Sequence, residues 1–196
     1  MLVDIDTQYD FMNPRGKLYI PGASDIIPGL TRVFSNALDR GEKIISTLDW
    51  HPMDDEEFKK FPPHCIEHTF GAGKIHPTDV YNKQYICDFM PDREEPADIE
   101  SRRQYYLYKS CTDIWDPAKG NPSMFTKLIQ MIQPEHIFVC GVALDICVIN
   151  AIKGLLTFNI PMTLLTDAVK GISDEGKALE DIARLGVCLG NSSGML

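Results

Sequence analysis

The 196-residue chain contains no C-x-x-C pair among its six cysteines. This spacing argues against a zinc ribbon or a disulfide framework, so we expect reduced thiols. No stretch resembles a signal peptide or a long apolar span, and we therefore expect a cytoplasmic protein. Basic residues are also scarce, because 19 Lys and Arg stand against 28 Asp and Glu, a net charge of −9. This balance argues against nucleic acid or a membrane as partner.

The overall composition is that of a globular protein, with 44% hydrophobic and 24% charged residues. A chain of this length suits one domain, which can bury a core without disulfide support. We therefore expect a single domain over residues 1–196.

Short apolar runs alternate with segments of helical periodicity. The runs predict strands at 1–5, 43–48, 104–108, 136–140, 161–165 and 187–189. The helical segments are 25–40, which Ser24 can cap, 123–133, 144–158 and 174–185. Strands that alternate with helices imply βαβ units. The predicted fold class is α/β, a three-layer α/β/α sandwich around a mainly parallel, doubly wound, Rossmann-like sheet.

One long segment, at about 49–102, has neither periodicity. So long an aperiodic stretch within a domain is usually a functional loop or a disordered insert. Its density of His, Asp and aromatic residues favours the functional loop. Within it, residues 84–89 suggest a small edge strand, and residues 92–103 are charged and expected to be exposed.

Polar side chains stand where the predicted strands end. Asp6 follows the first strand and Lys109 the third, and Cys147 lies in the first turn of the helix after the fourth. In parallel sheets, ligands bind outside the carboxyl ends of the strands. Helix N–H groups and the Lys109 charge can stabilise a thiolate, and Asp6 can accept the thiol proton. The plainer alternatives are a small buried cysteine, a surface lysine and a carboxylate that braces a loop.

A second group follows the second strand. Asp49 and His51 are two residues apart, so they point to the same side of an extended chain, and His64 comes after a stiff Pro62-Pro63 pair. With Glu57 between them, these carboxylate and imidazole groups suit zinc first, with manganese or iron(II) as alternatives. They are also compatible with ordinary hydrogen bonds in a polar loop.

Together these residues resemble a known family, the isochorismatase-like cysteine hydrolases, and within it the nicotinamidases (pyrazinamidases). Residues 6–11 are similar to the D-x-Q-N-D-F opening of that family, and Lys109 stands at the end of the strand that carries its catalytic lysine. Residues 141–148, G-V-A-L-D-I-C-V, are similar to its nucleophile motif. The stretch from Asp49 to Cys65 is similar to the metal loop of the nicotinamidases, with Glu57 where many members have a third histidine.

The resemblance implies a role for each of these residues. Cys147 would be the nucleophile, Asp6 the proton shuttle and Lys109 the supporting charge. The backbone N–H groups of Ala143 and Cys147 would form the oxyanion hole, with a cis bond between Val142 and Ala143. The resemblance further implies that Asp49, His51, Glu57 and His64 hold a divalent metal ion, and that Phe11 and Phe61 enclose the substrate ring.

The leading hypothesis is therefore a metal-dependent nicotinamidase that hydrolyses a small amide through a cysteine thioester and serves NAD salvage. A related amidohydrolase acting on another small amide or ureido compound is a second reading. A non-catalytic α/β binding protein is a third. Family members are often homo-oligomers, and the acidic surface is compatible with that state.

Overall fold

The computed structural model describes residues 1–86 and 101–195. Their seven strands form one sheet in the order β3-β4-β2-β1-β5-β6-β7, and every neighbouring pair is parallel. The strands are β1 (Leu2–Ile5), β2 (Ile44–Asp49), β3 (Lys83–Ile86), β4 (Gln104–Lys109), β5 (Ile137–Val142), β6 (Met162–Lys170) and β7 (Cys188–Gly190). The predicted parallel, doubly wound α/β sheet is confirmed.

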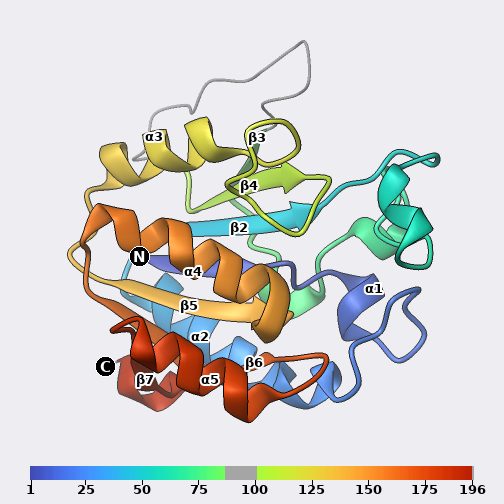
Figure 1. The fold of residues 1–196 in the computed structure, drawn as a ribbon. Coiled ribbons are helices and arrows are strands. Elements are labelled where there is room, and N and C mark those ends of the chain that lie inside the picture. The colour runs from blue at the N-terminus through green and yellow to red at the C-terminus, as the bar shows by residue number, and fades with distance from the viewer. Residues whose placement is uncertain (87–100, 196) are drawn as a thin grey trace.

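Helices cover both faces of this sheet. They are α1 (Tyr9–Met12), α2 (Ile27–Asp39), α3 (Pro122–Ile132), α4 (Ile149–Leu155) and α5 (Glu175–Arg184). In Figure 1, α3, α4 and α5 lie in front of the sheet and α2 lies behind it. Alternate strand residues point to opposite faces, so Val3 and Val139 join the α3–α5 core while Leu2 and Cys140 join the α2 core. The predicted three-layer sandwich is confirmed.

Two local predictions are wrong. Ser24 does not cap the first long helix, because a 3₁₀ turn (Ala23–Ile26) precedes α2 and the Ser24 hydroxyl contacts Tyr19. The strand predicted at 161–165 continues to Lys170, because it pairs with β5 again after an irregular step. The polar Thr166 and Asp167 conceal that continuation in the sequence.

The long aperiodic segment contains three 3₁₀ turns in its described part: Glu56–Lys59, Phe70–Ala72 and His76–Thr78. The edge strand expected at 84–89 is confirmed as β3, although residues 87–89 lie outside the described part. Most of the charged stretch expected at 92–103 lies outside it as well. Among the described residues, no helix combines the length and the apolar character needed to cross a membrane.

The strand order places the site. The order reverses between the central strands β1 and β5, where an α/β sheet opens a crevice at its carboxyl edge. In Figure 1 the strands point to the right, toward α1 and the turquoise segment that follows β2. Asp6, Asp49, Lys109 and Cys147 all belong to that edge.

Candidate active site

Three predicted catalytic residues lie together at the carboxyl edge of the sheet. Asp6 directly follows β1 and has a left-handed backbone (φ 49°) that turns the chain out of the sheet. Lys109 is the last residue of β4, and Cys147 lies in a π-helical turn, Leu144–Val148, directly after β5. Lys109 Nζ is 2.8 Å from Asp6 Oδ2 and 3.9 Å from Cys147 Sγ.

Lys109 also contacts Asp49 Oδ1, so one fully buried ammonium group stands between two carboxylates. Burial by itself would lower the pKa of Lys109, but Asp49 and Asp6 raise it well above its ordinary value. Burial opposes ionisation of Asp49 too, yet the Lys109 charge keeps the pKa of Asp49 below its usual range. Lys109 and Asp49 therefore form a permanent ion pair.

Asp6 is the carboxylate suited to carrying a proton. Burial raises its pKa, and neither Lys109 nor the 2.6 Å hydrogen bond donated by Thr47 offsets that effect. Burial also raises the pKa of Cys147 well above the ordinary value; Lys109 opposes this, and the negative charge of Asp6 adds to it. The resting cysteine is thus a thiol, not the stabilised thiolate that its position at a helix start suggests. Its proton must leave as the sulfur attacks, and Asp6 is the adjacent acceptor.

The turn that carries the predicted nucleophile, Cys147, is fixed by its packing against β1. Gly141 has φ 115°, and a Cβ on it would lie 2.0 Å from the Ile5 carbonyl oxygen. Only glycine fits this position. The cis bond expected between Val142 and Ala143 is present. Ala143 and Cys147 line the same cavity, which is the arrangement that a shared oxyanion site requires.

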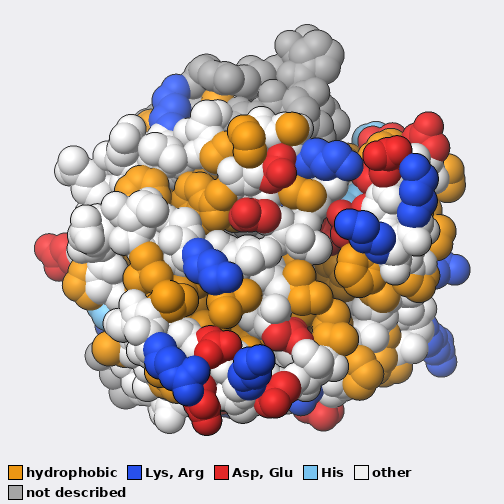
Figure 2. Space-filling view, viewed as in Figure 1, with side chains coloured by type: hydrophobic (Ala, Val, Ile, Leu, Met, Phe, Trp, Pro, Cys, Tyr) orange, Lys and Arg blue, Asp and Glu red, His pale blue; other side chains and the backbone are white. Residues whose placement is uncertain are grey.

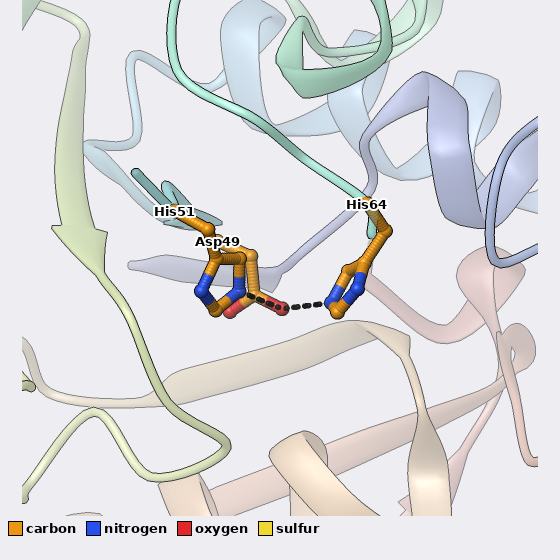
Figure 3. Close-up of side chains that lie close together, drawn as sticks. All are labelled: Asp49, His51 and His64. Atoms are coloured by element: carbon orange, nitrogen blue, oxygen red, sulfur yellow. Dashed lines mark ion pairs between the residues drawn. The ribbon is translucent and has the colours of Figure 1, made fainter. Parts of the chain in front are cut away.

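A group able to hold a metal ion adjoins these residues. Ligand atoms of Asp49, His51 and His64 all lie within 4.8 Å of one another, and all three side chains are buried. Figure 3 shows the Asp49 carboxylate between the two imidazole rings, with Oδ2 at 3.7 Å from each Nε2. One Asp49 oxygen therefore faces Lys109 and the other faces the histidines.

The surroundings of both rings fit a metal ion. His51 Nδ1 is 3.0 Å from Asp55, and His64 Nδ1 is 2.8 Å from the Pro62 carbonyl oxygen. Each contact fixes the ring so that Nε2 faces the centre of the group. Among the described residues, His51 Nε2 is buried with no hydrogen-bond partner. A metal ion would satisfy that nitrogen, and an Asp-His-His donor set suits zinc.

Glu57, the fourth predicted ligand, is not part of the close three-residue group. It lines the same cavity, and burial together with the negative charge of Asp49 raises its pKa. The cavity is a small, mostly apolar one. Besides Asp6, Cys147 and the predicted Phe11 and Phe61, its lining includes Leu18, Ile20, Ile146 and Ile172. In Figure 2, hydrophobic side chains gather beside the lobe at the right, which carries charges of both signs.

The structure brings in residues that sequence reasoning missed. Asp55 supports His51, and Phe58 packs on the rings of His51 and His64, with centroids 5.4 and 5.8 Å apart. Ile172 reaches the cavity from the loop after β6. The spacing of Asp55 four residues after His51 was the only sequence signal, and it lay within a run of four acidic residues.

Comparison with known proteins gives the same assignment. The chain is 23% identical to a nicotinamidase of Saccharomyces cerevisiae, covering 92% of each protein. It is 25% identical to a pyrazinamidase of Pyrococcus horikoshii solved with zinc, covering 97% of each chain with a TM-score of 0.75. The resemblance to nicotinamidases is confirmed. No protein-family model matches the chain.

The prediction of an amidohydrolase is confirmed by the same relatives. The fold is also that of an N-carbamoylsarcosine amidase from Thermoplasma acidophilum, with 19% identity, a TM-score of 0.74 and coverage of 97% and 95% of the two chains. This isochorismatase-like fold is therefore shared by enzymes of different substrate specificity, and the substrate depends on the cavity.

Proposed function

We propose that the protein is a metal-dependent nicotinamidase, which converts nicotinamide and water to nicotinate and ammonia for NAD salvage. One observation supports this proposal most: the Asp49 carboxylate joins the catalytic and metal-binding groups. Its Oδ1 contacts Lys109, while its Oδ2 faces the ring nitrogens of His51 and His64. A ligand that touches the metal therefore lies beside the nucleophile.

The first half of the reaction forms a thioester. Asp6 accepts the thiol proton as Cys147 Sγ bonds to the carboxamide carbon, and the carbonyl oxygen becomes an oxyanion. The N–H groups of Ala143 and Cys147 would hold that oxyanion. Asp6 then returns the proton to the amide nitrogen, the C–N bond breaks, and ammonia leaves. Lys109 keeps its charge and stabilises the negative groups around it.

The second half releases the acid. Asp6 accepts a proton from water, the resulting oxygen nucleophile attacks the thioester, and the sulfur leaves and regains its proton. When bound, the divalent ion supplies a Lewis-acid contact for the pyridine nitrogen and so orients the ring. Phe11 and Phe61 line the cavity and would enclose that ring.

The charge of the cavity favours a neutral amide. Among the described residues, its lining includes the carboxylates Asp6, Asp49 and Glu57 but no Lys or Arg. The adjacent Lys109 is already paired with two of these carboxylates. Apart from the metal ion, which the neutral ring nitrogen would occupy, an anionic ureido acid would meet these carboxylates and no free side-chain cation among the described residues, which costs binding energy. Nicotinamide is uncharged and carries the ring nitrogen that a metal can bind.

Ammonia release from nicotinamide and from a neutral and an anionic control amide, with metal-loaded wild-type protein and Cys147→Ala, tests the proposal. We expect Cys147-dependent turnover of nicotinamide. Turnover of another amide alone would establish the second reading, a related amidohydrolase. No turnover of any of these amides by the metal-loaded protein would favour the third reading, a non-catalytic binding protein. The cytoplasmic location and a homo-oligomeric state stay predictions.

A further inference from the structure

Asp49 lies where its backbone should be unpaired. In β2, the backbone N–H and C=O groups of odd-numbered residues point toward β1, and those of even-numbered residues point toward β4. The Thr47 carbonyl accepts from the Asp6 N–H at 3.2 Å, and the Trp50 N–H donates to the Lys109 carbonyl of β4 at 2.7 Å. β1 ends at Ile5, which pairs with Thr47. No residue of β1 therefore remains to pair with Asp49.

The side chain of Gln8 takes that place. Its Oε1 accepts from the Asp49 N–H at 2.7 Å, and its Nε2 donates to the Asp49 carbonyl at 2.7 Å. The second Nε2 hydrogen goes to the Ala72 carbonyl at 2.8 Å. Gln8 is fully buried, so water cannot replace these bonds. The amide group thus extends the sheet by one pairing, as a backbone peptide would.

We propose that Gln8 is a positioning residue that holds Asp49 between Lys109 and the two histidines. This proposal rests on the metal-dependent form of the proposed function. Gln8 holds the backbone of Asp49 itself, and Lys109 of β4 holds the neighbouring Trp50, so the chain at this point presents one carboxylate oxygen of Asp49 to each group. Without Gln8, Asp49 N–H and C=O are left buried and unpaired, and the residue must shift to recover partners.

The residue type is set by this task. Only a side-chain amide offers a donor and an acceptor with the spacing of a peptide group. Glutamate would retain the acceptor but would place negative charge against the carbonyls of Asp49 and Ala72. Methionine has a similar size and offers neither the donor nor a comparable acceptor, so Gln8→Met removes the hydrogen bonds without opening a large cavity.

Gln104 provides a matched control. It is also fully buried in the sheet, and its amide also makes three hydrogen bonds: to Ser46 at 2.7 Å, to the Thr78 carbonyl at 2.9 Å and from Val80 N–H at 2.7 Å. None of these partners is a predicted catalytic or metal-binding residue. Gln104→Met should therefore destabilise the fold as Gln8→Met does while it leaves Asp49 in place.

The test measures zinc dissociation constants by chelator competition without substrate, and exchange of the Asp49 amide hydrogen by NMR. We expect Gln8→Met to weaken zinc binding about 10–100-fold and Gln104→Met to change it by less than about threefold. Exchange at Asp49 should accelerate only in Gln8→Met. Equal zinc affinity in both variants and the wild type, an equal loss in both variants, or a wild type that binds no zinc would overturn the proposal. A wild type that binds zinc but leaves nicotinamide unchanged would refute the proposed function alone.

Discussion

The described part of the chain contains two largely buried groups that each combine Asp, Lys and Cys, and one of them is the predicted catalytic group. The first is Asp6, Lys109 and Cys147. The second is Asp4, Lys74 and Cys140, in which Lys74 pairs with Asp4 and Cys140 Sγ lies 3.9 Å from Asp4 Oδ1. Both cysteines have a pKa that burial raises well above the ordinary value. Residue types and local charge therefore do not distinguish the two groups.

Access and hydrogen bonding distinguish them. Asp4 lies within β1, and Ser46, Thr7 and Lys74 donate to its carboxylate. Asp6 lies where β1 ends, and its contacts are fewer: Thr47 donates to Oδ1, and Lys109 lies 2.8 Å from Oδ2. Asp6 and Cys147 line the cavity, whereas no member of the Asp4 group does. Asp4, whose carboxylate accepts from three side chains, braces the fold. Asp6 has fewer donors and lies beside the cavity, where it can exchange a proton.

Replacing each of the two cysteines by alanine should give the largest difference in activity. Cys147→Ala should lower nicotinamide hydrolysis by about 10⁴-fold or more, since the nucleophile is lost. Cys140→Ala should keep activity near the wild-type level, because its sulfur contacts Asp4 and belongs to the α2 core, away from the cavity. Ammonia release at saturating substrate measures both. An active Cys147→Ala protein would remove the thioester from the mechanism.

Replacing Lys109 should affect catalysis, whereas replacing Lys74 should affect only the stability of the fold. Lys109→Met should reduce kcat by about 10²–10³-fold through lost charge stabilisation, and it should also destabilise the fold, because Asp6 and Asp49 then stay buried without their cation. Lys74→Met leaves Asp4 buried without its cation, which should lower the free energy of unfolding by about 3–5 kcal/mol. Denaturant titration and activity per folded molecule separate the effects. If Lys74→Met abolished turnover in folded protein, the Asp4 group would have a part in catalysis.

The predicted metal site is a further difference between the two groups, because its Asp49 contacts Lys109 of the Asp6 group. Asp55→Asn should weaken zinc binding about 10-fold, since it weakens the support of His51 Nδ1. The neighbouring Asp54 is exposed, so Asp54→Asn is the matched control. Zinc competition with a chromophoric chelator measures both variants. Equal affinity in the two would mean that Asp55 has no part in orienting His51.

We expect the smallest effect at the loop after β6, which lines the cavity beside Asp6 and Cys147. Asp145 accepts hydrogen bonds from Ile172 N–H and Ser173 N–H, both at 2.9 Å, and thereby holds Ile172 at the cavity. We expect Asp145→Asn to raise KM about two- to fivefold with little change in kcat, because the catalytic groups are untouched. An unchanged KM would show that the loop position is set by other contacts.

The pH dependence of the same contact follows from its charge. Burial opposes ionisation of Asp145, but the hydrogen bonds from Ser173 and Ile172 lower its pKa below the ordinary value of 3.8. The folded state therefore binds fewer protons than the unfolded state near that pKa. The stability that Asp145 supplies should be complete above pH 3.8 and should fall as the pH drops through its lowered pKa. Denaturant titrations of wild type and Asp145→Asn should converge only at acid pH.

Much of this arrangement could be predicted from the sequence, since strands alternate with helices and polar residues mark the strand ends. Asp6, Lys109 and Cys147 needed only that rule and the family resemblance. Asp55 and Gln8 were not assigned these tasks, because each acts through a hydrogen bond that depends on how distant segments pack. The hydrophobic periodicity of a sequence does not indicate such a contact. Glu57 shows the converse: a plausible ligand by residue type lies beside the three-residue group and not within it.

The central pairing of the sheet has a consequence for synthesis. Leu2 of β1 pairs with Phe138 of β5, and the nucleophile follows β5. A ribosome must therefore release most of the chain before the proton acceptor near one end can meet its cysteine. Nascent chains that stop short of β5 contain every predicted metal ligand but not the predicted nucleophile.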